Sequence, residues 1–196
     1  MDPVVDDRSA TRVGPGALLV AAPGLLDPNF RRTVVYLIEH RERGSLGVVL
    51  NRPSEVALHD VLPGWAPLSS RPPSVFVGGP VDGKTALCLA ALRTGHRADG
   101  TPGLVAVNGP VALVDLDGDP EALAPRVRGL RVFAGYAGWG PEQLEGEIGE
   151  GAWFVVDSDP DDALCTEPGD LWRTVLKRQG GEYALVSTFP PDPTMN

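Results

Sequence analysis

Two short apolar segments dominate the first quarter of the chain. Residues 33–38 are rich in β-branched and apolar side chains, as in a buried strand, and residues 46–50 repeat this pattern after a glycine-containing connection. The turn sequence Asp27-Pro28-Asn29 precedes the first segment, because Asp caps backbone groups, Pro presets φ and Asn tolerates unusual dihedral angles. The block therefore predicts a turn, a strand, a tight return and a second strand, so that any fold of this chain must contain a sheet.

Further apolar segments alternate with turn signals along the rest of the chain. Residues 103–108 and 111–116 flank an Asn-Gly pair and predict two paired strands. Short helices are expected from residues 53–55, after a cap at Asp119, and over an apolar stripe at 171–176, and a last strand is expected at 183–187. Many strands with interspersed short helices predict an α+β domain with a mixed sheet.

The length and the ends of the chain bound its organisation. A chain of 196 residues fits a single domain, which we assign to residues 14–196, after an acidic and disordered tail at residues 1–13. The first residues lack the basic and apolar regions of a secretory signal, and no run of 18 apolar residues suggests a membrane span. Two distant cysteines without a CxxC pattern favour reduced thiols, so we expect a cytoplasmic protein with no membrane contact.

The net charge of −9 is unevenly distributed along the chain. Residues 1–97 carry 11 basic and 9 acidic groups, whereas residues 98–196 carry 6 basic and 17 acidic groups. An acidic chain repels nucleic acid phosphates, which normally require a basic footprint, and no helix-turn-helix pattern is visible. The composition therefore argues against direct DNA binding, unless the arginine-rich first half forms a local basic patch.

Polar side chains gather at the ends of the two predicted hairpin strands. They are Asn29, Arg31, Arg32, His40, Asn51 and Arg52. Guanidinium groups form forked hydrogen bonds with carboxylates and phosphates, so this set predicts a surface for a small anion or an acidic protein segment. An equally plausible interpretation from the sequence pairs these arginines with acidic residues of the second half.

A second informative segment, residues 135–145, combines small residues with aromatic and polar ones. Glycines allow close backbone approach, and Tyr136 and Trp139 add large amphipathic contacts, while Gln143 and Glu145 fall near the start of a predicted helix. The segment predicts either a turn packed against the sheet or one wall of a pocket or partner surface. The two interpretations stay open at the level of the sequence.

The pattern of a phosphate-binding P-loop occurs at residues 78–85. Its candidate nucleotide ligands are Gly78, Gly83, Lys84, Thr85 and, about thirty residues later, Asp115. The apolar residues 86–92 could form either a strand or a buried helix. Because Asp82 would place a carboxylate inside the phosphate cradle, and because the surrounding β-α alternation is missing, we favour a strand turn over a nucleotide site.

Other catalytic and metal-binding patterns are missing from the sequence. The three histidines form no HExxH motif, no Gly-x-Ser-x-Gly occurs, and Asp115, Asp117 and Asp119 lack the glutamate that completes a calcium loop. Cys88 lies in an apolar run and is expected to be a core thiol. We therefore assign no catalytic residue, metal or cofactor.

Several separated blocks, in order and over nearly the whole chain, resemble the bacterial YqgE/AlgH family. These blocks are residues 18–21, Asp27-Pro-Asn-Phe, Asn51-Arg-Pro, Gly78-Gly-Pro-Val, Gly135-Tyr-Ala-Gly-Trp, Gln143-Leu-Glu, Trp153, Leu171-Trp and the ending Pro191-Asp-Pro-Thr-Met-Asn. The resemblance implies one compact α/β-type domain with a branched mixed sheet, flanking short helices and a small closed barrel. It brings the label of a putative transcriptional regulator and no settled catalytic residues.

Together these observations favour a cytosolic, non-enzymatic binding or regulatory protein that acts through a protein partner or a small anionic ligand. The first alternative is a nucleotide-binding enzyme that uses the P-loop pattern. The second alternative is a transcriptional regulator that binds DNA directly, with which the acidic balance agrees poorly.

Overall fold

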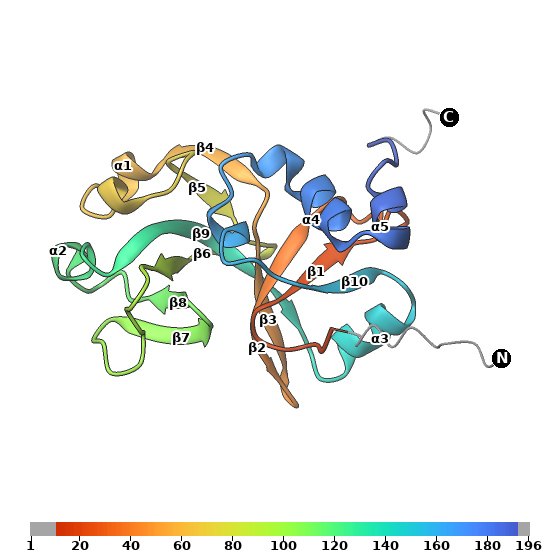
Figure 1. Cartoon of the computed structure of the whole chain (residues 1–196), viewed down its shortest axis with the longest axis horizontal. Coiled ribbons are helices and arrows are strands. Elements are labelled where there is room, and N and C mark those ends of the chain that lie inside the picture. The colour runs from red at the N-terminus through yellow and green to blue at the C-terminus, as the bar shows by residue number, and fades with distance from the viewer. Residues whose placement is uncertain (1–10, 192–196) are drawn as a thin grey trace.

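A ten-stranded, mostly antiparallel sheet forms the body of the protein in a computed structural model that describes residues 11–191 (Figure 1). The strands are β1 (Ala17–Ala21), β2 (Val34–Arg41), β3 (Gly44–Val49), β4 (Pro53–Ala57), β5 (Ser74–Val77), β6 (Val81–Leu92), β7 (Leu104–Asn108), β8 (Val111–Val114), β9 (Val127–Trp139) and β10 (Trp153–Asp157). The helices are α1 (Leu58–Val61), α2 (Pro120–Leu123), α3 (Gln143–Gly149), α4 (Leu171–Gln179) and α5 (Gly181–Val186), with short 3-10 helices η1 (Ala66–Leu68), η2 (Asp162–Leu164) and η3 (Pro168–Asp170).

Strand β9 is the point at which the sheet branches. The main path runs β10-β1-β2-β3-β9-β6-β8-β7, so β9 joins the β1–β3 half to the β6–β8 half. One edge of β9 pairs with β6, while the other edge pairs with β3 near its end and with β5 near its middle. The pairing of β5 with β9 is parallel, and β4 adds to β5 in the antiparallel sense.

The sheet curls into a half-barrel and does not close, so the predicted fold class with its small closed barrel is wrong. Strand β7 ends the path, and a gap of about 190 Å³ separates it from the end of β2. Side chains from both strands, including Ile38 and Val107, line this gap. They hold the two backbones apart, and no ladder joins them. The expected combination of a sheet with a few short helices is present (Figure 1).

Two local predictions fail because long-range contacts decide the structure. Residues 53–57 form strand β4 instead of a helix start, and the Ser54 hydroxyl donates a hydrogen bond of 2.6 Å to the carbonyl of Val75 on β5. Residues 181–186 form helix α5 instead of the last strand. Tyr183 and Val186, three residues apart, face the same core, which is the spacing of a helix.

Two other local predictions are confirmed. Strands β7 and β8 pair around Asn108-Gly109, where Gly109 has a φ of +53°. The Asp119 side chain caps α2 by accepting a hydrogen bond of 2.9 Å from the amide of Glu121.

Helices cover both faces of the β1–β3 half of the sheet. Helix α4 places Leu171, Trp172, Val175 and Leu176 on one face, and the Trp172 indole donates a hydrogen bond of 2.8 Å to the carbonyl of Ala21. Helix α3 covers the opposite face with the buried side chain of Leu144. A separate apolar core lies in the β6–β8 half, beneath α1 and α2.

A carboxylate fixes an aromatic cluster on the α3 side of the sheet. The rings of Phe30, Trp139 and Trp153 have centroids 5.4 to 6.0 Å apart. Glu147 accepts hydrogen bonds from both indoles, 2.9 Å from Trp139 and 2.8 Å from Trp153, and a third of 3.0 Å from Gln143. Because Glu147 lies on α3 and the indoles lie on β9 and β10, this carboxylate ties the helix to the sheet.

We expect Glu147→Ala to lower the free energy of unfolding by about 2–3 kcal/mol, since hydrogen bonds to a charged group are worth roughly that much and the indole donors lose their acceptor. Urea unfolding followed by tryptophan fluorescence measures the change. Glu150→Ala, which removes an exposed carboxylate next to the same helix, is the control and should change stability by less than about 0.5 kcal/mol. Equal losses in both variants would contradict the assigned role of Glu147.

Candidate functional site

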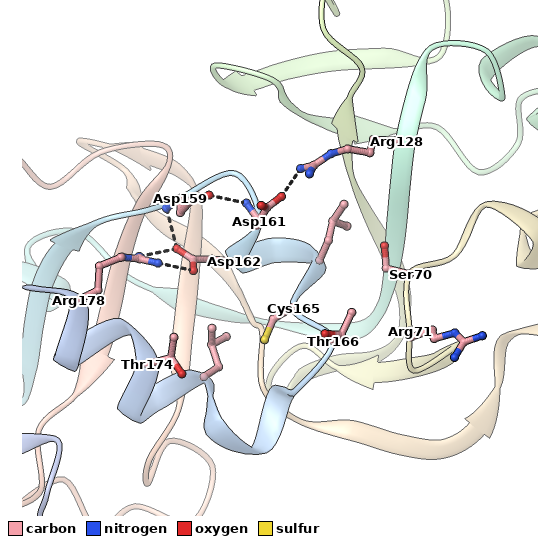
Figure 2. A pocket seen from close by; sticks show the side chains of 12 residues that line it. Ser70, Arg71, Arg128, Asp159, Asp161, Asp162, Cys165, Thr166, Thr174 and Arg178 are labelled. Atoms are coloured by element: carbon pink, nitrogen blue, oxygen red, sulfur yellow. Dashed lines mark hydrogen bonds and ion pairs between the residues drawn. The ribbon is translucent and has the colours of Figure 1, made fainter.

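A cleft of about 570 Å³ lies between the two halves of the sheet on the α4 side (Figure 2). One wall comes from the loop before β5, with Ser70 and Arg71, and from the start of β9, with Arg128. The other wall comes from the connection between β10 and α4, with Cys165 and Thr166, and from α4 itself. Segments far apart in the sequence therefore meet at this one place.

Two ion pairs lie in the cleft, one within a wall and one across it (Figure 2). Asp162 is buried and holds Arg178 with two hydrogen bonds, of 2.9 and 2.7 Å. These bonds raise the pKa of Arg178. Asp161 pairs with Arg128 across the cleft, and Asp162 also accepts a hydrogen bond of 2.7 Å from the amide of Asp159. The charges of Arg128 and Arg178 are thus largely satisfied by neighbouring aspartates.

Beneath the cleft lies a buried arginine, Arg131 of β9, with only 1% of its surface exposed. Its guanidinium donates hydrogen bonds to the carbonyls of Arg71 at 2.6 Å, Cys165 at 2.9 Å and Ala163 at 3.3 Å. It also stacks over the ring of Phe76 at 4.1 Å. Its three hydrogen-bond acceptors come from both walls of the cleft, so this one side chain joins them.

The Arg131 charge has no carboxylate partner among residues 11–191. Its Nε atom is buried and lacks a hydrogen-bond partner within the same residues. Burial lowers the pKa of Arg131 to about 10, which leaves the group charged at neutral pH. A full positive charge therefore lies under the cleft and is satisfied only by carbonyl dipoles and a ring face.

Several polar groups of the cleft remain available for a ligand. Within the described part of the chain, the side chains of Ser70, Arg71, Thr166 and Thr174 form no hydrogen bond or ion pair. Arg71 lies at the opposite side of the cleft from Asp162 and Arg178 (Figure 2). The cleft thus offers hydroxyl donors between the Asp162–Arg178 ion pair on one side and the exposed guanidinium of Arg71 on the other.

The Cys165 thiol lies in the cleft and is half-buried. Burial raises its pKa, and the opposing effects of a backbone hydrogen bond and of Arg131 do not reverse this direction. Cys88 lies in the core, where burial raises the pKa of its thiol strongly. Both groups are therefore protonated thiols at neutral pH.

Sequence reasoning missed the residues that build this cleft. Its members Ser70, Arg71, Thr166, Thr174 and Arg178 belong to no recognisable motif, because they come from distant segments. One signal was present: Arg131 interrupts the apolar run at residues 130–134, and a charge in the middle of a buried strand indicates a special environment.

The structure does not bring the predicted hairpin surface together as one site. Strand β2 runs from Val34 to Arg41 and places Arg32 and His40 near opposite ends. Around Arg32, the Asn51 side chain accepts a hydrogen bond of 3.0 Å from the amide of Val34 and donates one of 2.8 Å to the carbonyl of Arg32. Asn51 therefore holds the strand start in place.

The Arg52 guanidinium has a similar structural role in the turn before β2. It donates hydrogen bonds of 2.8 and 3.1 Å to the carbonyls of Asn29 and Arg31. Burial lowers the pKa of Arg52, and the nearby charge of Asp27 opposes this effect. Arg52 therefore binds backbone carbonyls. Among the described residues it does not pair with acidic residues of the second half, which was the alternative interpretation.

Arg31 and Arg32 bind the carboxyl-terminal segment of the described chain. Arg31 donates to the carbonyl of Pro191, and Arg32 donates to the carbonyls of Phe189, at 2.9 Å, and Pro190. The Arg32 guanidinium also lies 4.0 Å from the centre of the Trp172 ring. Burial, and then the charges of Arg173 and Arg31, lower the pKa of Arg32. The predicted surface is basic here, and it extends to Arg173 on α4.

The other predicted site residues lie around α3. His40 contacts Ser45 at 2.7 Å and Glu145 at 3.5 Å. Trp139 and Gln143 are held by Glu147, as described above. Tyr136 is half-buried and pairs with Val81 of β6. Packing of the turn against the sheet therefore accounts for Trp139 and Gln143.

The residues of the P-loop pattern form a strand and its preceding turn, not a nucleotide site. Residues 81–92 form strand β6, so the helix that a P-loop requires does not follow. An added Cβ would lie 2.3 Å from the carbonyl oxygen of Gly135 at Gly78, and 2.2 Å from the carbonyl of Tyr136 at Gly79. Close approach of two backbones, rather than a phosphate, explains these glycines.

The remaining members of the pattern are dispersed. Lys84 is exposed on β6, where Thr85 donates a hydrogen bond to Asp82, and Gly83 is in the same strand. Asp115 accepts a hydrogen bond of 3.0 Å from the amide of Asp117 in the turn after β8. These positions form no phosphate cradle.

No cluster of three or more histidine, cysteine, aspartate or glutamate side chains within residues 11–191 is arranged to hold a metal ion. No helix in this range combines the length and apolar character needed to cross a membrane.

Replacing Arg131 with methionine should lower the free energy of unfolding by about 3–5 kcal/mol, because three buried or part-buried carbonyls lose their donor. Urea unfolding measures the effect. Arg128→Met is the control: its ion pair with Asp161 is exposed, so the loss should be about 1 kcal/mol or less. A similar small loss in both variants would mean that Arg131 does not hold the cleft walls together.

Thiol labelling tests the electrostatics of the cleft. Because burial raises the pKa of Cys165, its alkylation by iodoacetamide should be slow at pH 7.5 and should keep accelerating up to pH 9.5. Cys88 should react only after unfolding in guanidinium, which is the control for full reactivity. Mass spectrometry of labelled peptides distinguishes the two. A rate for Cys165 that levels off below pH 8 would indicate a reactive thiolate and contradict this assignment.

Comparisons with other sequences agree across nearly the full chain. A family model described as AlgH-like matches residues 18–184. A UPF0301 protein of Rhodococcus opacus is 53% identical over 194 residues, which cover 97% of this chain and 96% of the relative. A UPF0301 protein of Streptomyces coelicolor is 54% identical over 182 residues, which cover 92% and 94% of the two chains.

Two solved structures are similar to this fold. A crystal structure of a Corynebacterium diphtheriae protein has a TM-score of 0.88 and 36% sequence identity, and the match covers 91% of this chain and 94% of that one. The solution structure of the AlgH protein from Pseudomonas aeruginosa has a TM-score of 0.66 and 28% identity, with 92% and 97% coverage.

Proposed function

Because this chain belongs to the AlgH-like family, and because the names of its relatives state no activity, we propose its function from the geometry of the cleft. It is a non-enzymatic binding protein that takes a small anionic ligand in the cleft above Arg131. The observation that carries this proposal is the buried Arg131 charge without a carboxylate partner in the described chain.

Charge balance supports an anion as the ligand. Buried charges in proteins are normally paired, since desolvation of an isolated charge is costly. Four arginines, Arg131 and the lining Arg71, Arg128 and Arg178, meet three aspartates in the cleft, which leaves an excess of one positive charge. The chain as a whole carries −9, so this local excess stands against the overall charge. A bound anion would supply the missing countercharge.

The size and the available donors of the cleft support a small ligand. A volume of about 570 Å³ is within the range of roughly 300–1,000 Å³ that is typical of small-molecule sites. Hydroxyl groups of Ser70, Thr166 and Thr174 and the guanidinium of Arg71 are hydrogen-bond donors of the kind that hold carboxylates and phosphates.

The chemistry of the cleft supports binding rather than catalysis. A cysteine nucleophile reacts as its thiolate, whereas burial raises the pKa of Cys165 and keeps it protonated. Asp161 and Asp162 are engaged by Arg128 and Arg178, and Asp159 accepts a hydrogen bond of 3.0 Å from the amide of Asp161, so all three carboxylates of the cleft already have partners. Nothing in this arrangement favours a covalent step.

Thermal shift and calorimetric titration with inorganic phosphate, citrate and adenosine monophosphate test the proposal. At least one anion at about one hundred times its Kd should stabilise the native state by about 2.7 kcal/mol through mass action. Arg71→Gln combined with Thr166→Val should weaken that anion at least tenfold, because it removes a guanidinium and a hydroxyl donor.

Arg97→Gln, which removes an exposed arginine outside the cleft, is the matched control and should leave affinity unchanged. Urea unfolding of each variant verifies that its fold is intact. The proposal is rejected if none of the three anions at 10 mM raises the melting temperature, or if the cleft variant binds as tightly as the control.

A further inference from the structure

Helix α4 borders a second hollow, next to the cleft, with Thr174 lining both. A groove of about 580 Å³ lies between α4 and α5 and is lined by Asp170, Arg173, Thr174, Lys177, Ser187 and Thr188. The Ser187 hydroxyl donates to the carbonyl of Ala184, and the Thr188 hydroxyl donates to that of Leu185. The donors left to face the groove are therefore the two cationic side chains, Arg173 and Lys177, and the hydroxyl of Thr174.

These two cations are exposed, and neither forms an ion pair with a carboxylate of residues 11–191. Arg173 lies close enough to Arg32 that its charge lowers the pKa of Arg32. The basic character therefore continues from the groove to the arginines that hold the segment after α5. Among residues 11–191, Asp170 is the one acidic side chain that lines the groove, while Glu182 of α5 is exposed but does not line it.

Exposed apolar side chains flank the same basic patch. Leu185 on α5 is 69% exposed, and Phe189, whose carbonyl is bound by Arg32, is 48% exposed. Both residues are next in sequence to residues that line the groove, Ala184 and Thr188, and exposed apolar side chains near a charged groove are typical of surfaces that bind another macromolecule. The groove thus combines positive charge with apolar contact area.

We infer that the groove between α4 and α5 binds an acidic, extended segment of a partner protein that also carries an apolar side chain. Charge complementarity selects this occupant, because the groove presents two cations and one carboxylate in a chain whose net charge is −9. Arg173 and Lys177 would pair with carboxylates, and Leu185 would contact the apolar side chain. A concave groove favours a single chain segment over the flat surface of an anionic membrane.

Fluorescence anisotropy with a labelled 12-residue peptide of alternating glutamate and aspartate, interrupted by two leucines, tests this inference. At 50 mM salt we expect binding that weakens as salt rises, because screening reduces the attraction. Arg173→Glu with Lys177→Glu should weaken it at least tenfold. Leu185→Ser should weaken it about fivefold, as expected from the loss of about 1 kcal/mol of apolar contact.

Arg43→Glu with Arg97→Glu is the matched control, since it changes the net charge by a similar amount at two exposed arginines outside the groove. This control should bind much more tightly than the groove variant. The cleft variant Arg71→Gln with Thr166→Val should keep its peptide affinity, so failure of the anion proposal and failure of this one are distinguishable.

Four outcomes would overturn the inference. The first is that the peptide does not bind, and the second is that both charge-reversal variants lose binding equally. The third is that phosphatidylglycerol vesicles bind the groove and the peptide does not displace them, which would identify a membrane as the occupant. The fourth is sedimentation evidence of self-association that Arg173→Glu with Lys177→Glu abolishes, which would identify a second copy.

Discussion

The positions of the two halves of the molecule relative to each other depend on one buried charge, that of Arg131. Removing the Arg131 guanidinium from water costs several kcal/mol, and carbonyl dipoles and the face of Phe76 offset that cost. The carbonyls belong to the loop before β5 and to the connection between β10 and α4. Since β9 carries Arg131 through the middle of the sheet, one side chain positions both walls of the cleft relative to the strand between them.

Strand β9 can branch because glycines let neighbouring backbones approach it. Gly135 has a φ of +73°, and a Cβ there would lie 2.7 Å from the carbonyl oxygen of Gly79 and 2.9 Å from that of Val81. A Cβ at Gly78 or Gly79 would in turn meet the backbone of Gly135 or Tyr136 on β9. These close approaches allow β5 and β6 to lie on opposite edges of β9, and the sheet curls around that point without closing.

Sequence reasoning succeeded where local chemistry decides the structure. The hairpin of β2 and β3, the Asn-Gly turn between β7 and β8, and the Asp119 cap follow from side chains within a few residues of one another. It failed where a distant partner decides: β4 exists because β5 pairs with it, and α5 exists because Tyr183 and Val186 share a core with β10. The open seam beside β7 is also a property of side chains from separate strands.

The candidate site was the least predictable part, for the same reason. Ser70, Arg128, Cys165 and Thr174 come together only after the sheet has curled. The P-loop pattern illustrates the ambiguity of local signals, since closely spaced glycines indicate that something must come near the backbone but do not identify it. In this protein, the group that comes near Gly78 and Gly79 is the backbone of strand β9. Arginines at the hairpin ends were likewise recognised as important, although most of their hydrogen bonds stabilise the fold.

Thr174 lines both the cleft and the groove, because α4 forms a shared wall between them. A translation or rotation of this helix changes the shape of both spaces at once. Thermodynamic linkage then requires that any influence of one occupant on the other be reciprocal and equal in free energy. The helix is therefore the element through which two separate binding equilibria of this chain would communicate.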